Sequence, residues 1–246
     1  MVRPMKRSLT TGALIALLCS FALAQKADRS GTMSLNSIID GLEKKQTAQF
    51  SYEVIREYRL FGTDTTKANS EVIAKLVVKT PEGSDYNIQQ ASGSSRGQQI
   101  IRAVLDHEIE VISTHNEARM ALTRNNYDFT YIGEAILDGQ PCYRVGLKPK
   151  RKDKELVSGE AWIDKRSFSI RQVQGEVART PSWWLRSVHV KLIFAEVKGA
   201  WLQTSMEAVA DVRIVGLHTL TSRIRDYHAD TEVASIILAP LHDRKH

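Results

Sequence analysis

The sequence predicts an α+β protein in which a long antiparallel meander of about ten strands packs against two helices. Most segments after residue 50 alternate apolar with polar residues, which is the period of a half-buried strand. These segments follow one another with only short turns between them, as in an antiparallel sheet. Two segments, around residues 35–42 and 101–112, instead repeat their apolar residues at helical spacing.

The first 24 residues have the pattern of a secretory signal peptide. Three basic residues within the first seven positions precede an apolar stretch that ends in Ala22-Leu23-Ala24. The stretch is too short and too mixed to predict a membrane span. We therefore predict cleavage after Ala24, a single domain over residues 25–246, and a location in the periplasm.

Charge and cysteine content limit the function classes. Removing the three basic residues lowers the formal charge from +6 to +3, which is too mild to predict nucleic-acid binding. Cys19 would leave with the signal peptide, and Leu18 stands where a lipoprotein signal needs a small residue. Cys142 would then have no partner for an internal disulfide, so we interpret it as a small buried thiol.

The expected elements follow from the same periods. Ser34 is a suitable N-cap for the first helix. Asp138-Gly139 predicts a tight hairpin turn of type I′, and Lys198-Gly199 joins two later strands. Strands are expected over residues 49–62, 71–79, 84–90, 127–137, 140–150, 159–164, 167–177, 184–197, 200–216 and 219–228.

The sequence contains no G-x-S-x-G elbow, P-loop or strand-following G-x-G-x-x-G. His107, Glu110 and His115 would share roughly one helix face, but Val111 stands where H-E-x-x-H needs its second histidine. A solvated helix face is the preferred interpretation. The basic run at 148–155 is interpreted as a solvated hairpin end, with an anionic membrane or an acidic partner as the alternative. We therefore predict no enzyme, no catalytic residue, no metal and no cofactor.

Two features leave a structural and a binding role open. Arg56 lies in register with the apolar face of its strand, where a buried guanidinium needs partners. It either reaches an edge with its charged end or bonds carbonyls or a ligand head group. Trp183 and Trp184 are adjacent on an expected strand, so we expect one in the core and the other at a rim or against a ligand.

Residues 133–151 and 159–176 resemble the outer-membrane lipoprotein-sorting family, which includes the periplasmic carriers LolA and LolB. The resemblance lies in a G-E…L-D-G…P-C-Y hairpin, basic residues, and then the Trp162-Ile163-Asp164 sequence before a turn. It implies a curved, unclosed antiparallel β-barrel with two or three helices covering its concave face. It also implies a cavity that shelters acyl chains. None of the family's site residues matches a position here.

The apolar faces of two late strands are predicted to line this cavity. In residues 200–216 the even positions, through Ile214, combine small residues with a flexible methionine, a composition that leaves room for a chain. The predicted ligand-binding residues are Val190, Leu192, Phe194, Leu202, Met206, Val212, Arg56 and Trp184.

Three functions remain open. The preferred one is a non-enzymatic periplasmic carrier that shelters the acyl chains of lipoproteins, or a lipid, for sorting to the outer membrane. The alternative is a periplasmic sensor or adaptor of the same fold that regulates an envelope stress response, and the third is a hydrolase or metalloenzyme. The carrier hypothesis predicts a monomer whose partners are acyl chains and a membrane-protein donor or acceptor.

Overall fold

The computed structural model describes residues 33–45, 51–79, 83–113 and 117–229. Contacts divide the chain at residue 34, and the unit from Leu35 onward holds every described helix and strand. Its elements are α1 (Leu35–Lys45), β1 (Tyr52–Phe61), β2 (Ser70–Lys79), β3 (Gly83–Gly93), α2 (Ser95–Ser113), α3 (Glu117–Met120), β4 (Tyr127–Leu137), β5 (Gln140–Pro149), β6 (Val157–Asp164), β7 (Ile170–Val177), β8 (Leu185–Val197), β9 (Ala200–Val212) and β10 (Gly216–Ala229).

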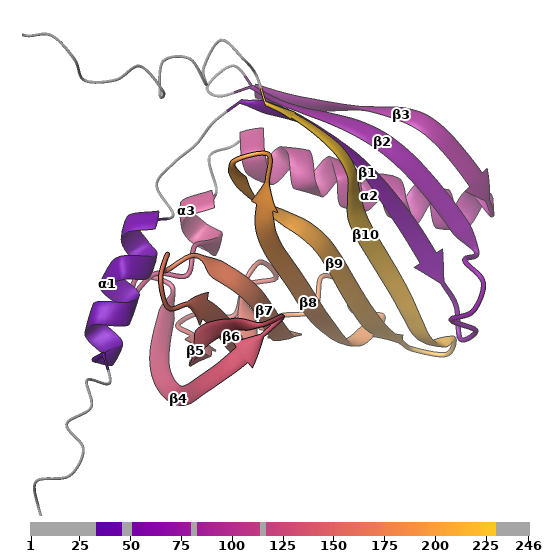
Figure 1. The fold of residues 1–246 in the computed structure, drawn as a ribbon. Helices are drawn as coiled ribbons and strands as arrows, with labels where there is room; N and C mark the ends of the chain where they lie inside the picture. The colour runs from indigo at the N-terminus through magenta and orange to yellow at the C-terminus, as the bar shows by residue number, and fades with distance from the viewer. Residues whose placement is uncertain (1–32, 46–50, 80–82, 114–116, 230–246) are drawn as a thin grey trace, which may run out of the picture. The chain divides into compact units, whose positions relative to one another are not determined.

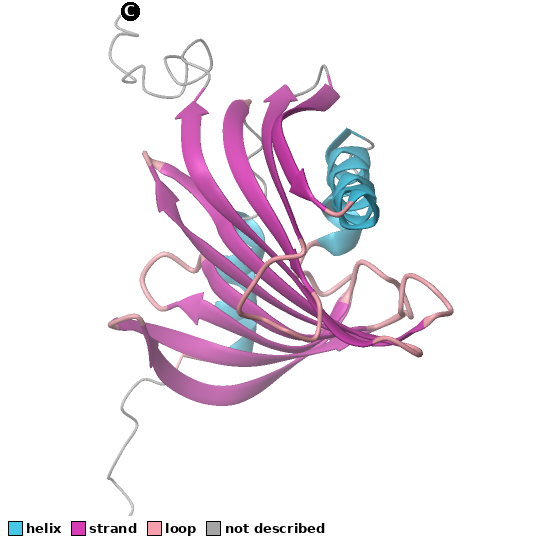
Figure 2. Ribbon diagram, turned by 90° about the vertical axis from the view of Figure 1, so that its right-hand side faces the viewer, coloured by secondary structure: helices cyan, strands magenta, loops and turns pink. Residues whose placement is uncertain are grey.

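The ten strands form one antiparallel sheet in the order β3-β2-β1-β10-β9-β8-β7-β6-β5-β4 (Figures 1 and 2). β1 pairs with β10, which brings the first and last strands of the chain together in the sheet. β3 and β4 stand at the two edges, so the curved sheet is an unclosed barrel. The predicted α+β class and antiparallel meander are confirmed. Among the described residues, none of the helices combines the length and apolar character needed to cross a bilayer.

Two tight turns set the register of their hairpins. Asp138 and Gly139 have φ angles of 49° and 76°, and Lys198 and Gly199 have φ angles of 49° and 86°. Positive φ at both central residues is the mark of a type I′ turn, whose twist matches that of the flanking strands. The hairpins β4–β5 and β8–β9 therefore form where the sequence predicts them.

Two apolar cores lie under the helices. The first packs Ile38, Ile39 and Leu42 of α1 against β4 to β7. The second packs Ile101 and Leu105 of α2 against β1, β2 and β10. Cys142 is buried in β5, as predicted, and burial raises the pKa of its thiol.

Several element boundaries differ from the sequence expectation, among them those of β8, β9 and α2. β8 begins at Leu185, so Trp183 and Trp184 precede it in a turn. Both indoles are exposed, and the expectation that one enters the core is wrong because no sheet pleat holds them. β9 ends at Val212, so Ile214 lies in the β9–β10 turn and is fully exposed rather than interior. α2 begins at Ser95, six residues before Ile101, the first residue of its buried stripe.

A buried carboxylate ties β1 to β10 on the face opposite the helices. Glu57 is only 1% exposed and is paired by Arg59 at 3.0 Å and by Arg223 and Arg225. Burial alone would raise the pKa of this carboxyl, but hydrogen bonds from Arg223 and Arg225, together with the charge of Arg59, lower it. The ionised carboxylate thus stabilises the pairing of strands that lie at opposite ends of the sequence.

We expect Glu57→Gln to lower the free energy of unfolding at neutral pH by about 1–3 kcal/mol, because hydrogen bonds to a charged group are lost. The lowered pKa fixes the sign of the pH dependence. The stabilisation is complete above the ordinary carboxyl pKa of 4.5 and is lost as the pH falls through the lower folded-state value. Urea unfolding of both proteins from neutral to acidic pH should show their difference shrinking with acid. A constant difference would contradict the role of ionisation.

The backbones of β6 and β7 approach closely at two paired glycines, Gly159 and Gly175. A Cβ placed on Gly159 would lie 2.1 Å from the carbonyl oxygen of Gln174 and 2.7 Å from the Cα of Gly175. Rigid backbone atoms cannot yield as a flexible side chain can. Any side chain at Gly159 must therefore separate the two strands.

Gly159→Ala should destabilise the protein by about 1–3 kcal/mol, the usual cost of overpacking. Gly146→Ala on the neighbouring β5 is the matched control, because its Cβ would meet nothing closer than 3.5 Å. Thermal melting of the two variants beside the wild type measures the difference. Equal melting temperatures for both variants would show that the strand contact is not tight.

Candidate ligand-binding face

Strand register connects the two cores through the middle of the sheet. Directly opposite residues of an antiparallel pair share a face. One continuous row on the helix-covered face consists of Val145, Ala161, Val173, Leu192, Met206, Ser222, Tyr58 and Val72. Both ends of this row are buried, but Leu192 and Met206 at its centre are only half-buried.

The adjacent row shows the same change. It consists of Leu147, Gly159, Gly175, Val190, Ala208, Leu220 and Leu60. Its ends are buried leucines, whereas its centre holds two glycines and the half-buried Val190 and Ala208. Because the side chains at the centre are small, the part of this face between α1 and α2 is the part least filled by side chains.

We call the half-buried apolar residues of β8, β9 and β10 on this face the central seam. Three of them pack on the first core and three on the second. A packed core would bury such side chains fully, so the seam is apolar surface that neither helix covers. Its members are Val190, Leu192, Phe194, Met206, Ala208 and Ile224.

Four of the sequence-predicted ligand residues therefore lie together in the central seam: Val190, Leu192, Phe194 and Met206. Leu202 and Val212 are 7% exposed and lie toward the two ends of β9, away from the seam's centre. Trp184 lies outside the seam, in the turn before β8.

Arg56 is buried on the helix-covered face beside the seam. One of its terminal nitrogens, Nη2, donates to the backbone carbonyl of Gln203 at 2.9 Å, and the other, Nη1, lies 3.6 Å from the Glu108 carboxylate of α2. Its Nε has no hydrogen-bond partner among the described residues, and neither has the buried hydroxyl of Ser222. Ser222 is opposite Tyr58 in the register, next to the position of Arg56 on the same face.

The charge of this arrangement is balanced by Glu108. Burial alone would lower the pKa of the Arg56 guanidinium, but Glu108 and two tyrosines outweigh it, and the pKa is raised. Tyr58 donates its hydroxyl to the other oxygen of Glu108 at 2.8 Å. Burial, with a further contribution from Glu108, raises the pKa of the Tyr58 phenol. Arg56 is thus charged and Tyr58 is neutral. Their polar atoms lie beside the apolar central seam.

Sequence reasoning identified Arg56 from its register with apolar residues but missed Glu108 and Ser222. Glu108 belongs to the helical segment whose histidine and acids suggested a metal site. The partner of a buried arginine depends on which helix crosses its strand, which no local pattern reveals. Ser222 stands between Leu220 and Ile224 in the apolar register of β10, as Arg56 does in β1, but a small hydroxyl residue there gives no indication of what it contacts.

The opposite face carries two shallow depressions, of about 350 and 340 Å³. The first lies over β6 to β9, and the second lies over β1 and β8 to β10 beside Glu57. Charged side chains line both, among them Lys191 and Glu207. Apolar residues also line both depressions, but the charged side chains at their surface distinguish them from the predicted acyl-chain cavity.

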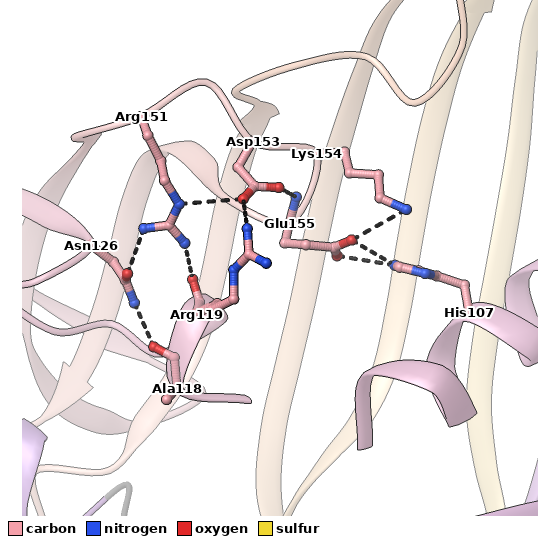
Figure 3. A network of polar contacts seen from close by, with 8 residues as sticks. All are labelled: His107, Ala118, Arg119, Asn126, Arg151, Asp153, Lys154 and Glu155. Carbon is pink, nitrogen blue, oxygen red and sulfur yellow. Dashed lines mark hydrogen bonds and ion pairs between the residues drawn. The ribbon is translucent and has the colours of Figure 1, made fainter. Parts of the chain in front are cut away.

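A polar network fixes the far end of α2, α3 and the β5–β6 loop to one another (Figure 3). Arg151 donates to the side chain of Asn126 and to the carbonyl of Arg119, and Asp153 pairs with both arginines. Asp153 and Glu155 are largely buried. The four lysines of residues 148–155 are exposed, as expected of a solvated hairpin end. That interpretation is wrong for Arg151, Asp153 and Glu155, whose charges are used in tertiary contacts.

His107 of α2 belongs to this network. Its Nε2 lies 2.9 Å from Glu155 (Figure 3). Its Nδ1 lies 3.7 Å from Glu110. His115 lies outside the described residues. Among the residues that are described, no group of three histidines, cysteines or acids is arranged to hold a metal ion.

The sequence pattern of a family of unknown function (DUF5686) matches residues 120–229. No curated protein matches the sequence closely enough to count as a relative.

Several solved structures are similar in fold. A LolA superfamily protein of Nitrosomonas europaea is 12% identical, with a TM-score of 0.41 over 80% of this chain and 94% of that chain. An outer membrane lipoprotein-sorting protein domain from Vibrio parahaemolyticus is also 12% identical, with a TM-score of 0.45 over 79% and 92%. A DUF1329 family protein from Desulfovibrio piger is 14% identical, with a TM-score of 0.41 over 79% and 92%. At these identities the similarity is one of fold alone.

Proposed function

We propose that this protein is a non-enzymatic carrier that binds an acyl chain of a lipid or lipoprotein along the central seam. The observation that carries the proposal is the half-buried apolar strip on the helix-covered face, between two fully buried cores. An acyl chain is long, narrow and apolar, as the strip is. Each methylene moved from water onto such a surface contributes about 0.8 kcal/mol.

Arg56 is proposed to orient the ligand. It lies beside the seam with its Nε unused by any described residue, and the Ser222 hydroxyl is unused on the same face. An acceptor oxygen at the head of an acyl chain would satisfy both donors, and buried donors without partners are costly. The contact requires that the side chains around Arg56 move, because its Nε is buried.

Export to the periplasm is part of the proposal and rests on the signal-like pattern of residues 1–24, which lie outside the described residues. In that compartment a carrier would shield acyl chains from water on the way to the outer membrane. The sensor or adaptor alternative would use the same ligand and differ in its protein partner. The two are distinguished by whether the bound chain is passed to a membrane acceptor.

We expect Ala208→Trp to reduce acyl-chain binding about tenfold, equivalent to the burial of about two methylene groups. Ala208 lies between Val190 and Leu220 in the register, so a large ring there would fill the seam. The measurement is displacement of a fluorescent fatty acid beside a melting curve. Val209→Trp, on the opposite face of the same strand, is the control and should bind as the wild type does.

If Ala208→Trp melts much earlier and the wild type never binds the probe, the seam is plain core and the carrier proposal fails.

Arg56→Met should weaken the binding of oleic acid by about tenfold or more, because a hydrogen bond to a charged group is worth about 1.5–3 kcal/mol. Binding of methyl oleate should fall less, since the ester carbonyl accepts a hydrogen bond from Arg56 but carries no charge. Arg59→Met provides the control, because Arg59 lies on the opposite face of β1 and pairs with Glu57 and Glu71. An equal loss for acid and ester would assign Arg56 a structural role only.

A further inference from the structure

Five large apolar side chains are exposed together at one end of the sheet, in the β7–β8 connection and around the β9–β10 turn. Among the described residues, the other large apolar side chains of similar exposure are Met33, Ile100, Ile132 and Ile136, which belong to other parts of the fold. We call the five the end patch. Its members and their exposed fractions are Trp183, 84%; Trp184, 40%; Ile214, 101%; Val215, 54%; and Leu217, 57%.

The end patch is one surface because its two segments are bonded to each other. The backbone nitrogen of Arg213 donates to the carbonyl of Trp184 at 2.9 Å. The Nε of the same arginine donates to the carbonyl of Trp183 at 3.0 Å. The underlying strands are also neighbours, with Leu185 of β8 opposite Val212 of β9. Both tryptophans are therefore held beside the turn that carries Ile214.

Folding does not account for isoleucine at position 214. Its φ angle is +79°, a left-handed conformation that suits glycine or asparagine and is strained for a β-branched residue. Its side chain is fully exposed, so no burial offsets the strain. An apolar side chain held in this way is suited to contact something outside the molecule.

Three exposed arginines lie in or next to the segments of the end patch. Arg179 and Arg213 belong to the two connections, and Arg186 lies at the start of β8, where Asp211 pairs with it at 3.6 Å. Tryptophan places its apolar ring and its N–H at the boundary between acyl chains and water, and arginine is attracted to anionic head groups. None of the five residues lines either depression of the opposite face.

We propose that the end patch is a membrane-contact surface that inserts Trp183 and Ile214 into the interface of a bilayer containing anionic lipid. The three arginines supply electrostatic attraction, and the apolar side chains supply partitioning. The inference rests on the end patch alone and does not depend on acyl-chain binding in the central seam.

The test is flotation of the full-length protein with vesicles of phosphatidylcholine and phosphatidylglycerol, compared with vesicles of phosphatidylcholine alone. The wild type should bind the anionic vesicles more tightly. The double variant Trp183→Ser/Ile214→Gly should bind them about tenfold more weakly or worse, from the loss of two apolar side chains. Arg179→Gln/Arg186→Gln should reduce the preference for anionic vesicles. Any contribution of residues 1–24 is the same in every variant.

Ile214→Gly alone separates binding from stability. Glycine accepts the positive φ, so the melting temperature should stay level or rise while vesicle binding falls. Ile136→Ser, in the β4–β5 hairpin, removes a side chain that is 77% exposed and should leave binding unchanged. The proposal is overturned if the wild type floats with neither vesicle, if the double variant floats as the wild type does, or if Ile136→Ser loses as much binding. Capture of a soluble protein by the end patch without vesicle binding would also overturn it.

Discussion

The helices of this fold cover only part of one face of the sheet. Ten strands about 4.8 Å apart form a sheet far wider than the roughly 10 Å diameter of a helix. α2 contacts β1 to β3 and α1 contacts β4, so each helix serves one end of the same face. Each helix builds a fully buried core beneath itself. The strands between them keep an apolar face without a helix to cover it. The central seam exists because the two helices are too narrow to cover these middle strands.

Burial of charge on both faces of β1 has a different consequence. Arg56 and Glu57 are consecutive, so their side chains point to opposite faces, and both are almost fully buried. A slip of the strand by one residue would place each ion on the wrong face, away from its partners. Glu57 faces arginines of β10, and Arg56 faces Glu108 of α2. These two sets of ion pairs therefore specify how β1 pairs with β10 and how it packs against α2.

The proposed binding surfaces are built differently because they face different environments. The central seam is lined by strand residues whose alternation keeps apolar groups on one face, so it is part of a regular sheet. The end patch is built from turns, where φ angles and backbone hydrogen bonds hold side chains that no sheet supports. Strained, exposed positions of this kind are costly for folding, which is why an apolar residue there requires an explanation from outside the core.

The sequence by itself determined the local structure. Alternation defined ten strands, Asp138-Gly139 and Lys198-Gly199 defined two hairpins, and the apolar face of β9 placed Met206 correctly. These features depend on near neighbours in the chain, and so a local pattern suffices to predict them. The strand boundaries at Trp184 and Ile214 were missed, because a turn flanked by apolar residues looks like a continued strand.

Only the tertiary structure decided which apolar residues remain half-buried and which charges pair. Val190 and Val145 both occupy apolar positions of alternating strands. Val190 lies in the seam and Val145 is fully buried, because burial depends on where α1 and α2 pack on the sheet. Arg56 finds Glu108 and the carbonyl of Gln203 across 52 and 147 residues of chain. Long-range pairing of this kind follows from strand order and helix placement, which the alternation of a single strand does not encode.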